Sequence, residues 1–571
     1  MHCGALHAGD DGGVVVVWLH KSPWSIGRAV HRLQLVLQYS YAVPMDFSSS
    51  SSAFSPPLAL LACLLLASFS WSSVRWRRRT RGRPLPPGPP RLPVVGNLFN
   101  HPRVKRWVAY HELCSRYGDV LYFSVMGQSI LVLDSARAVH ELLEKKAANT
   151  SDRTQSPMIE LSGSSLNFGF MPYGQRWRRH RRAFWQHFNQ GAAVAYWPAQ
   201  RASAHQFLWK LLRDPSRFRE HIRYTYAGVI LKVAYDIDVG DEDDSYVAAV
   251  DAALEGPVQG LVPGTFLVDF LPFLRHVPTW CPGATSQRLW AKWQAAAETL
   301  KNLPYDHVKA ALDQAASSDD GPRSIIGKLI QQITATEAGV RYEEEEIVKN
   351  VGAITFEAGL DTVYITTLAV FLAMTMHPAV LKKAHAELDR VVGPDRLPDF
   401  SDQDALVYVN AIVKETLRWH AVLPLGLPHC TVEDDELDGY FVPAGTMVMP
   451  NIWACMRDPE MYDEPEEFRP ERFIRDGKLD PAVRDPAALA FGHGRRICPG
   501  RYFAQAGLFI TVASVLHVFD ITPPVDDRGR PVQFTHGMED GFSSHPSDYR
   551  CTITPRSAQA EALILAHTRQ S

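Results

Sequence analysis

The stretch "FGHGRRICPG", residues 491–500, holds one cysteine in a loop bounded by glycines, with two arginines before it and a proline after it. The following residues, "RYFAQAGLFITVASVLHVF" (501–519), have the apolar content of a long buried helix. Pro499 suits the first turn of that helix, because its missing N–H needs no partner there. A sulfur at a helix N-terminus meets free backbone N–H groups, which stabilise a thiolate. The pattern therefore predicts a metal ligand at Cys498, and the alternative is a buried structural cysteine.

These residues also match a known signature. Phe491, Gly494, Arg496, Cys498 and Gly500 fit the pattern F-x-x-G-x-R-x-C-x-G, and through them the chain resembles the cytochrome P450 family. The resemblance implies a mainly α-helical cytochrome P450 fold with small β-sheets, which forms a single heme-thiolate catalytic domain. It further implies a heme b whose iron is axially ligated by the Cys498 thiolate, with Phe491, Gly494 and Arg496 binding the cofactor.

Two further segments suit the carboxylates of such a cofactor. Trp177 and Arg181 in "YGQRWRRHRRAF" are four residues apart, so an indole N–H and a guanidinium share one helix face. An exposed basic helix is the alternative interpretation. The resemblance implies that this pair, together with Arg496 and His429, contacts the heme propionates. Cys430, after His429, stands where many fungal members of the family have arginine.

A buried charge network is predicted beside the site. Glu415 and Arg418 in "VKETLRWH" are neighbours on one helix face, although other Glu-x-x-Arg pairs occur in the chain. Arg472 in "FRPERF" (468–473) resembles the third member of the family's Glu–Arg–Arg network. The expected role of the three side chains is structural support of the cysteine loop.

The sequence "AGLDT" (358–362) interrupts an apolar helix that extends over roughly 343–376. It resembles the family's acid–alcohol pair, which implies that Thr362 orders a water chain and that Asp361 connects this chain to solvent as a proton relay. Val363 replaces the usual hydroxyl residue after the threonine. Glu357 replaces the usual apolar residue, and we expect it either to face away from the pocket or to act as a second proton carrier.

The N-terminal part of the chain contains a candidate membrane anchor. Residues 54–74 include no charged side chain, and a helix of that length spans roughly 30 Å, one bilayer core. The basic run "RWRRRTRGR" (75–83) follows it and favours a cytosolic location of the chain beyond it. We therefore expect a single-pass protein of the endoplasmic reticulum membrane whose catalytic domain faces the cytosol. A cleaved signal peptide is the alternative.

The remaining organisation follows from composition. Residues 1–53 are interpreted as an N-terminal extension, of which 1–44 are hypothesised to be non-native because Met45 opens a normal start. A basic, proline-rich hinge is expected at 75–97, one catalytic domain at 98–560 and a tail at 561–571. Within the domain, we expect a helix at 104–118, two strands at 120–134 with a turn at Gly127–Gln128, and short strands at 437–449.

Composition also excludes some function classes. The net charge of -3 gives no basic field that would attract nucleic acid. The eight cysteines are scattered and contain no C-x-x-C pair, so neither a disulfide framework nor a zinc ribbon is indicated.

The expected pocket segments are 156–170, the stretch before Asp361, 422–428 and 538–546, and their apolar content suits a lipophilic small molecule such as a terpenoid or polyketide.

The resemblance is strongest to fungal microsomal, class II members of secondary metabolism, of the O-methylsterigmatocystin oxidoreductase type. It implies a monooxygenase that uses O2 and NADPH-derived electrons. The implied electron donor is NADPH-cytochrome P450 reductase, with cytochrome b5 as a second candidate, and Arg178, Arg179 and Arg495 are expected to meet the acidic partner. Two alternatives are a heme-thiolate isomerase or dehydratase without a reductase, and a heme-binding sensor without turnover.

Overall fold

The computed structural model describes residues 56–239, 244–262, 265–269, 271–314, 321–334 and 338–568. The chain divides into two units between Arg81 and Gly82, and each unit is treated by itself. The predicted extension, 1–53, lies outside the described residues, and so do the first two residues of the predicted anchor.

In the first unit the described chain forms one helix, α2 (Pro56–Thr80). The helix contains most of the predicted anchor and continues through the basic cluster, so residues 75–80 are helical and not part of a hinge. Leu60, Leu64 and Trp71 on this helix are 63%, 59% and 74% exposed. The helix therefore presents apolar side chains that the first unit does not bury.

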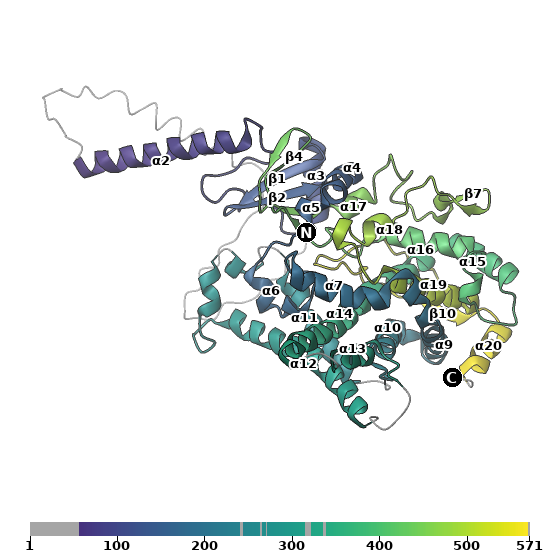
Figure 1. Ribbon diagram of the computed structural model, residues 1–571. Coiled ribbons are helices and arrows are strands. Elements are labelled where there is room, and N and C mark those ends of the chain that lie inside the picture. The colour runs from purple at the N-terminus through teal and green to yellow at the C-terminus, as the bar shows by residue number, and fades with distance from the viewer. Residues whose placement is uncertain are drawn as a thin grey trace, which may run out of the picture. The chain divides into compact units, whose positions relative to one another are not determined.

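The second unit is mainly helical with small sheets, as the sequence predicts (Figure 1). Its helices are α3 (Arg106–Tyr117), α4 (Ala136–Val139), α5 (Ala147–Thr150), α6 (Pro157–Leu161), α7 (Gln175–Phe188), α8 (Gln190–Ala193), α9 (Trp197–Arg213), α10 (Phe218–Tyr235), α11 (Ser245–Gly260), α12 (Thr285–Gln314), α13 (Ile325–Thr334), α14 (Ala338–Met376), α15 (Pro378–Val391), α16 (Val407–Trp419), α17 (Ile452–Cys455), α18 (Ala487–Ala490), α19 (Arg501–Val518) and α20 (Ala558–Thr568). Its strands are β1 (Val120–Val125), β2 (Gln128–Leu133), β3 (His429–Cys430), β4 (Asp435–Leu437), β5 (Tyr440–Val442), β6 (Met447–Pro450), β7 (Ile474–Arg475), β8 (Lys478–Leu479), β9 (Phe519–Thr522) and β10 (Thr552–Pro555).

The largest sheet has the strand order β1-β2-β6-β3. β1 and β2 form an antiparallel hairpin, whereas β6 runs parallel to β2 and carries β3 on its other edge. Met126 and Gly127 form the hairpin turn with φ values of 48° and 88°. The prediction of a turn at Gly127–Gln128 is wrong by one residue, because Gln128 already pairs with Val125. This sheet places His429 and Cys430 beside the helical part of the unit.

The proline-rich segment before the sheet is fixed on it. Tyr122 donates its backbone N–H to the carbonyl of Pro87 over 2.8 Å, and Asn97 donates its backbone N–H to the carbonyl of Ser124 over 2.6 Å. A Cβ on Gly88 would lie 2.0 Å from the Tyr122 carbonyl oxygen, so only glycine allows this approach. The second half of the predicted hinge is therefore an ordered edge of the second unit.

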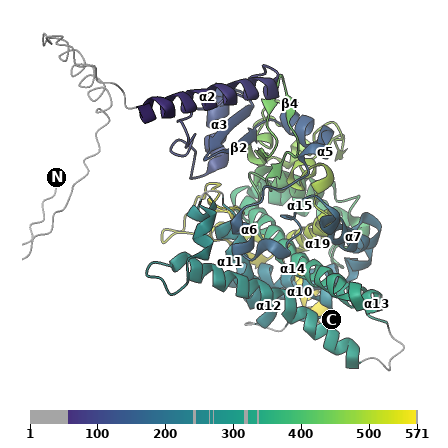
Figure 2. The same cartoon turned by 60° about the vertical axis from the view of Figure 1, so that its left-hand side comes forward.

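Helix α14 is the central helix of this unit. It packs against α7, α10, α12, α13, α16 and α19, and Figure 2 shows it among several of these helices. Among the described residues, one helical stretch, Arg341–Met376 of α14, is apolar and long enough to cross a bilayer, but 72% of its most apolar window is buried inside the protein. Burial on all sides explains the apolar composition of this core helix.

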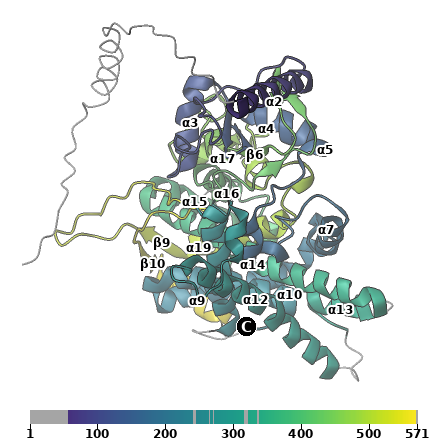
Figure 3. The same cartoon turned by 90° about the vertical axis from the view of Figure 1, so that its left-hand side faces the viewer.

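The C-terminal elements complete the core. α19 begins at Arg501 with Gly500 as its N-cap, so Pro499 precedes the helix and does not lie in its first turn as predicted. β9 and β10 pair beside α9 and α19 (Figure 3). The predicted tail is mostly helical: α20 packs on α9, and Ile564 is 1% exposed.

Candidate functional site

The cysteine loop is closed by its own backbone. Cys498 donates its N–H to the carbonyl of Phe491 over 2.7 Å, and Gly494 donates its N–H to the Glu144 carboxylate over 2.9 Å. Gly494 has a φ of 54°, and a Cβ there would lie 2.5 Å from the Leu143 carbonyl oxygen. Glycine is therefore required where the loop approaches the segment that carries Leu143 and Glu144.

The surroundings of Cys498 act on the pKa of its thiol in opposite directions. Burial raises the pKa of the Cys498 thiol, whereas the backbone N–H groups of Gly500 and Arg501 and the charges of Arg181 and Arg501 lower it. A metal ion on the sulfur outweighs the effect of burial. No cluster of three or more His, Cys, Asp or Glu side chains that suits a metal occurs in the described part of the chain. A single thiolate donor of this kind suits a metal that a macrocycle also holds.

Two buried guanidinium groups lie near the cysteine loop. Arg496 donates to the carbonyls of Ser151 (2.6 Å) and Met171 (2.7 Å) and stacks over Trp177, with its guanidinium carbon 4.5 Å from the ring centroid. Arg153, which the sequence analysis missed, is 6% exposed and donates to main-chain carbonyls that include Leu427 (2.8 Å).

Charge balance at these two arginines indicates an anion. Burial, followed by the nearby charge of Arg496, lowers the pKa of Arg153 to about 9. Burial likewise lowers the pKa of Arg496 to about 10. Among the described residues, neither forms an ion pair with a carboxylate. The charge of Asp152 partly offsets both cations, and two buried guanidinium groups near Cys498 fit the two propionates of a heme.

The other predicted cofactor contacts come from α7 and β3. Trp177 is buried on α7, and burial lowers the pKa of Arg181 to about 10. His429 Nδ1 donates to the Thr150 carbonyl over 2.8 Å, and burial, then Arg153, keep the His429 pKa well below the usual value. Because the Thr150 carbonyl is an acceptor, Nδ1 carries the proton of a neutral imidazole.

Two residues beside these groups add detail. Cys430 is buried, and its thiol donates a weak hydrogen bond to the Thr431 carbonyl over 3.6 Å. His493, which the sequence analysis did not single out, is 3% exposed, and no described residue forms a hydrogen bond with its Nε2. The sequence signal for His493 is its position in the cysteine loop, two residues after Phe491.

Helix α14 presents small residues at one place on its surface. Ala358 is exposed and Thr362 is partly exposed, although Glu357, Leu360 and Asp361 are buried. The Thr362 hydroxyl donates to the Ala358 carbonyl over 2.9 Å, and the helix continues without interruption. α14 packs against α7 and α19, the helices next to Trp177 and Cys498. Ala358 and Thr362 are therefore accessible on a helix whose neighbouring residues are mostly buried.

Asp361 is connected to groups that reach solvent. The Ser543 hydroxyl donates to Asp361 Oδ2 over 3.1 Å. Arg223 Nη1 and His545 Nε2 each lie 3.9 Å from Oδ1, and their side chains are 21% and 34% exposed. Ser543 and His545 belong to the expected pocket segment 538–546, but nothing in the sequence identified their partner. Arg223 was missed because its helix contact depends on tertiary packing.

Glu357 does not pair with Asp361. Its carboxylate accepts a hydrogen bond from the Asn167 side chain over 3.2 Å, and burial raises the pKa of Glu357 to about 7. Asn167 is held in turn because its Oδ1 accepts the Gly169 N–H over 2.8 Å. Glu357 thus joins α14 to the loop before α7.

The structure brings the three charged residues of the predicted network together. Arg418 donates to both Glu415 oxygens over 2.8 Å, and Arg472 donates to Glu415 Oε1 over 3.1 Å. Glu415 and Arg418 are fully buried. α16, which carries them, packs on α18 directly before the cysteine loop.

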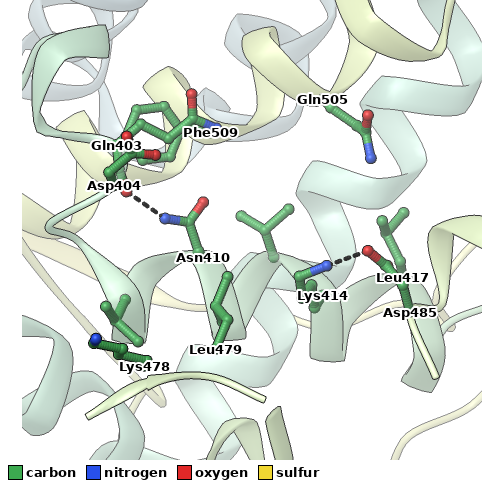
Figure 4. Close-up of a pocket in the computed structure, with 12 residues that line it drawn as sticks. Gln403, Asp404, Asn410, Lys414, Leu417, Lys478, Leu479, Asp485, Gln505 and Phe509 are labelled. Atoms are coloured by element: carbon green, nitrogen blue, oxygen red, sulfur yellow. Dashed lines mark hydrogen bonds and ion pairs between the residues drawn. The ribbon is translucent and has the colours of Figure 1, made fainter. Parts of the chain in front are cut away.

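A surface pocket near α16, β8 and α19 is separate from these groups (Figure 4). None of the predicted site residues lines it. Its lining residues are Gln403, Asp404, Val407, Asn410, Val413, Lys414, Leu417, Lys478, Leu479, Asp485, Gln505 and Phe509.

Comparison with known proteins agrees with this geometry. The family model described as Cytochrome P450 matches residues 86–553. The chain is 41% identical to "Cytochrome P450 monooxygenase COX2" of Coprinopsis cinerea over 85% of this chain and 92% of that protein. It is 36% identical to "Tryptamine 4-monooxygenase" of Psilocybe cyanescens over 88% of this chain and 98% of that protein. The chain therefore belongs to the cytochrome P450 family of monooxygenases.

Proposed function

We propose that this cytochrome P450 monooxygenase holds a heme b through the Cys498 thiolate and hydroxylates a lipophilic small molecule of fungal secondary metabolism. When bound, the heme supplies the activation of O2 and the oxidation of the substrate. The carrying observation is the partly buried Cys498, whose thiol pKa is lowered by the N–H groups of Gly500 and Arg501, together with the buried Arg153 and Arg496, which form no ion pair with a carboxylate among the described residues. The names of fungal relatives support the class of enzyme.

The residues around the cysteine have distinct tasks in this proposal. Arg153 and Arg496, fixed by main-chain carbonyls, provide the positive charge that orients the propionates. Trp177 and Arg181 on α7 and the neutral His429 contribute further donors. Phe491 and Gly494 shape the loop around the sulfur.

Proton delivery is assigned to α14. Asp361 receives protons on the side of Arg223 and His545 and passes them toward water at Thr362. The Thr362 hydroxyl donates its hydrogen to Ala358, which leaves the oxygen lone pairs free to accept a hydrogen bond from that water. An intact acid–alcohol pair supports monooxygenation over the isomerase, dehydratase and sensor alternatives.

Electrons are proposed to come from NADPH through NADPH-cytochrome P450 reductase or cytochrome b5. Arg178 and Arg495 are exposed and both contact Tyr173, so they support docking of an acidic partner. Arg179 is already paired with Glu343 (2.7 Å) and Glu344 (2.8 Å), which makes it the weaker candidate of the three.

Membrane attachment at the endoplasmic reticulum is proposed through α2. The helix joins an uncharged stretch to Arg77, Arg78 and Arg79 in its last turn, which supports a cytosolic second unit. In the second unit, Leu267, Phe273 and Trp280 are 67%, 65% and 81% exposed, and they support a second contact with lipid.

The test is the absorption spectrum of the reduced, carbon-monoxide-bound protein. A heme-thiolate protein absorbs far to the red of a histidine-ligated one, and Cys498→Ala is expected to abolish this band. Cys430→Ala is the matched control, because this buried cysteine lies beside His429 without contacting the loop. A band that survives in Cys498→Ala overturns the proposal, and product formed without NADPH and reductase favours the isomerase alternative.

A further inference from the structure

We propose that Glu357, together with Asn167, forms a recognition site for the protonated amine of the substrate, so that this enzyme oxidises an amine carried on an apolar skeleton. The inference rests on the proposed function, because it names the substrate class of the same pocket. It assigns to Glu357 a role in binding that neither the acid–alcohol pair nor the cysteine loop requires.

The first argument is location. On α14, Glu357 directly precedes the exposed Ala358 and lies one turn before Asp361. Its partner Asn167 lies in the loop before α7, where Gly169 approaches the Leu427 side chain and Phe170 contacts the Phe542 ring with centroids 6.1 Å apart. The expected pocket segments 156–170, 422–428 and 538–546 therefore meet at the loop that carries Asn167, the hydrogen-bond partner of this carboxylate.

The second argument is the lack of a cation. Glu357 is 6% exposed, and among the described residues its hydrogen-bond partner is the neutral amide of Asn167 alone. Its pKa responds to burial and then to the Asn167 N–H, and to no charged side chain in the described part of the chain. A buried carboxylate is ordinarily paired with a cation, and an ammonium group on the ligand supplies one.

The third argument separates an amine from a hydroxyl. Asn167 donates to one carboxylate oxygen, Oε2, and no described residue donates to Oε1. A neutral hydroxyl fills this acceptor without compensating the charge, whereas an ammonium group does both. The apolar rings of Phe170 and Phe542 suit the rest of such a ligand.

Three probes of nearly equal shape test the proposal: tryptamine, which carries an ammonium group; tryptophol, which carries a hydroxyl; and 3-propylindole, which carries a methyl group. Binding to the full-length holoprotein is measured by calorimetry at pH 8. We expect tryptamine to bind about tenfold or more tightly than the other two. Glu357→Gln is expected to remove this preference and leave 3-propylindole binding unchanged. Glu343→Gln, at an exposed position of the same helix, is the control.

A measurement without a variant protects the test against misfolding. For the wild-type protein, tryptamine affinity is expected to rise from pH 6 to pH 8, as Glu357 ionises, while 3-propylindole affinity stays constant. Equal affinities for all probes, a preference that survives in Glu357→Gln, or tryptophol binding as tightly as tryptamine overturns the inference. The carbon monoxide spectrum of the same samples reports separately whether the proposed heme-thiolate site is present.

Discussion

At the residue scale, Glu357 shows how a binding group and a stable core conflict. Burial raises the pKa of this carboxyl group, which has one amide partner in the interior, to about 7, so it is partly protonated at neutral pH. Such a group has a higher affinity for protons in the folded than in the unfolded protein. The stability that the protonated carboxyl group of Glu357 contributes is therefore fully present at low pH and is lost as the pH rises through its pKa in the folded protein.

This sign gives a prediction for Glu357→Gln. The amide cannot ionise, so the variant is expected to be more stable than the wild type at pH 8, by up to about 3 kcal/mol, and to lose this advantage below about pH 4.5. Thermal unfolding followed at both pH values measures the difference. A variant less stable than the wild type at pH 8 would show that Glu357 supports the fold. Glu343→Gln is expected to change little, because the side chain of Glu343 is 68% exposed.

At the element scale, α16 carries both a buried and an exposed ion pair, which allows a direct comparison. Arg418 and Glu415 are fully buried, and Arg418 also donates to the carbonyls of Met456 (3.0 Å) and Pro465 (2.7 Å). On the same helix, Lys414 pairs with Asp485, whose side chain is 47% exposed. The two pairs differ mainly in their access to water.

We predict that Arg418→Leu lowers the free energy of unfolding by about 3–5 kcal/mol, because it leaves the Glu415 carboxylate buried with one partner fewer. Lys414→Ala is expected to cost at most about 1 kcal/mol. Urea unfolding of both variants, followed by tryptophan fluorescence, makes the comparison. Equal losses in the two variants would contradict the assignment of the buried network as structural support.

Elements and sites differ in how far the sequence predicts them. The cysteine loop and the Glu415–Arg418 pair are local patterns, so their spacing predicts which side chains become neighbours. Arg153 lies in a polar stretch without such spacing, and Arg223 shares the Glu-x-x-Arg spacing only with Glu220, which gives no sign of its contact with Asp361. Their importance comes from burial beside Arg496 and from proximity to Asp361, which depend on how distant segments pack. The predicted position of the hairpin turn was wrong by one residue, because Met126 has a positive φ and methionine is unusual in that conformation.

At the scale of the whole molecule, the division between Arg81 and Gly82 separates the unit that contains α2 from the unit that contains Cys498. The second unit has its own hydrophobic core, which includes buried residues of α14 and α19. We predict that a protein starting at Gly82 keeps the heme-thiolate spectrum and binds lipid vesicles more weakly than the full chain. Flotation of both proteins with vesicles measures this. Loss of the spectrum on truncation would show that the catalytic unit depends on α2.

The site is assembled from parts of the chain that are far apart in sequence. Arg496 contacts Ser151 across 345 residues, and Arg153 contacts Leu427 across 274. During synthesis on the ribosome, the N-terminal residues of the site therefore cannot form these contacts until nearly the whole chain has emerged, and until then their arginines are exposed to water. Insertion of the prosthetic group is consequently one of the last steps of maturation. A transcript that ends before codon 498 yields a protein that cannot bind heme, even when porphyrin is supplied in excess.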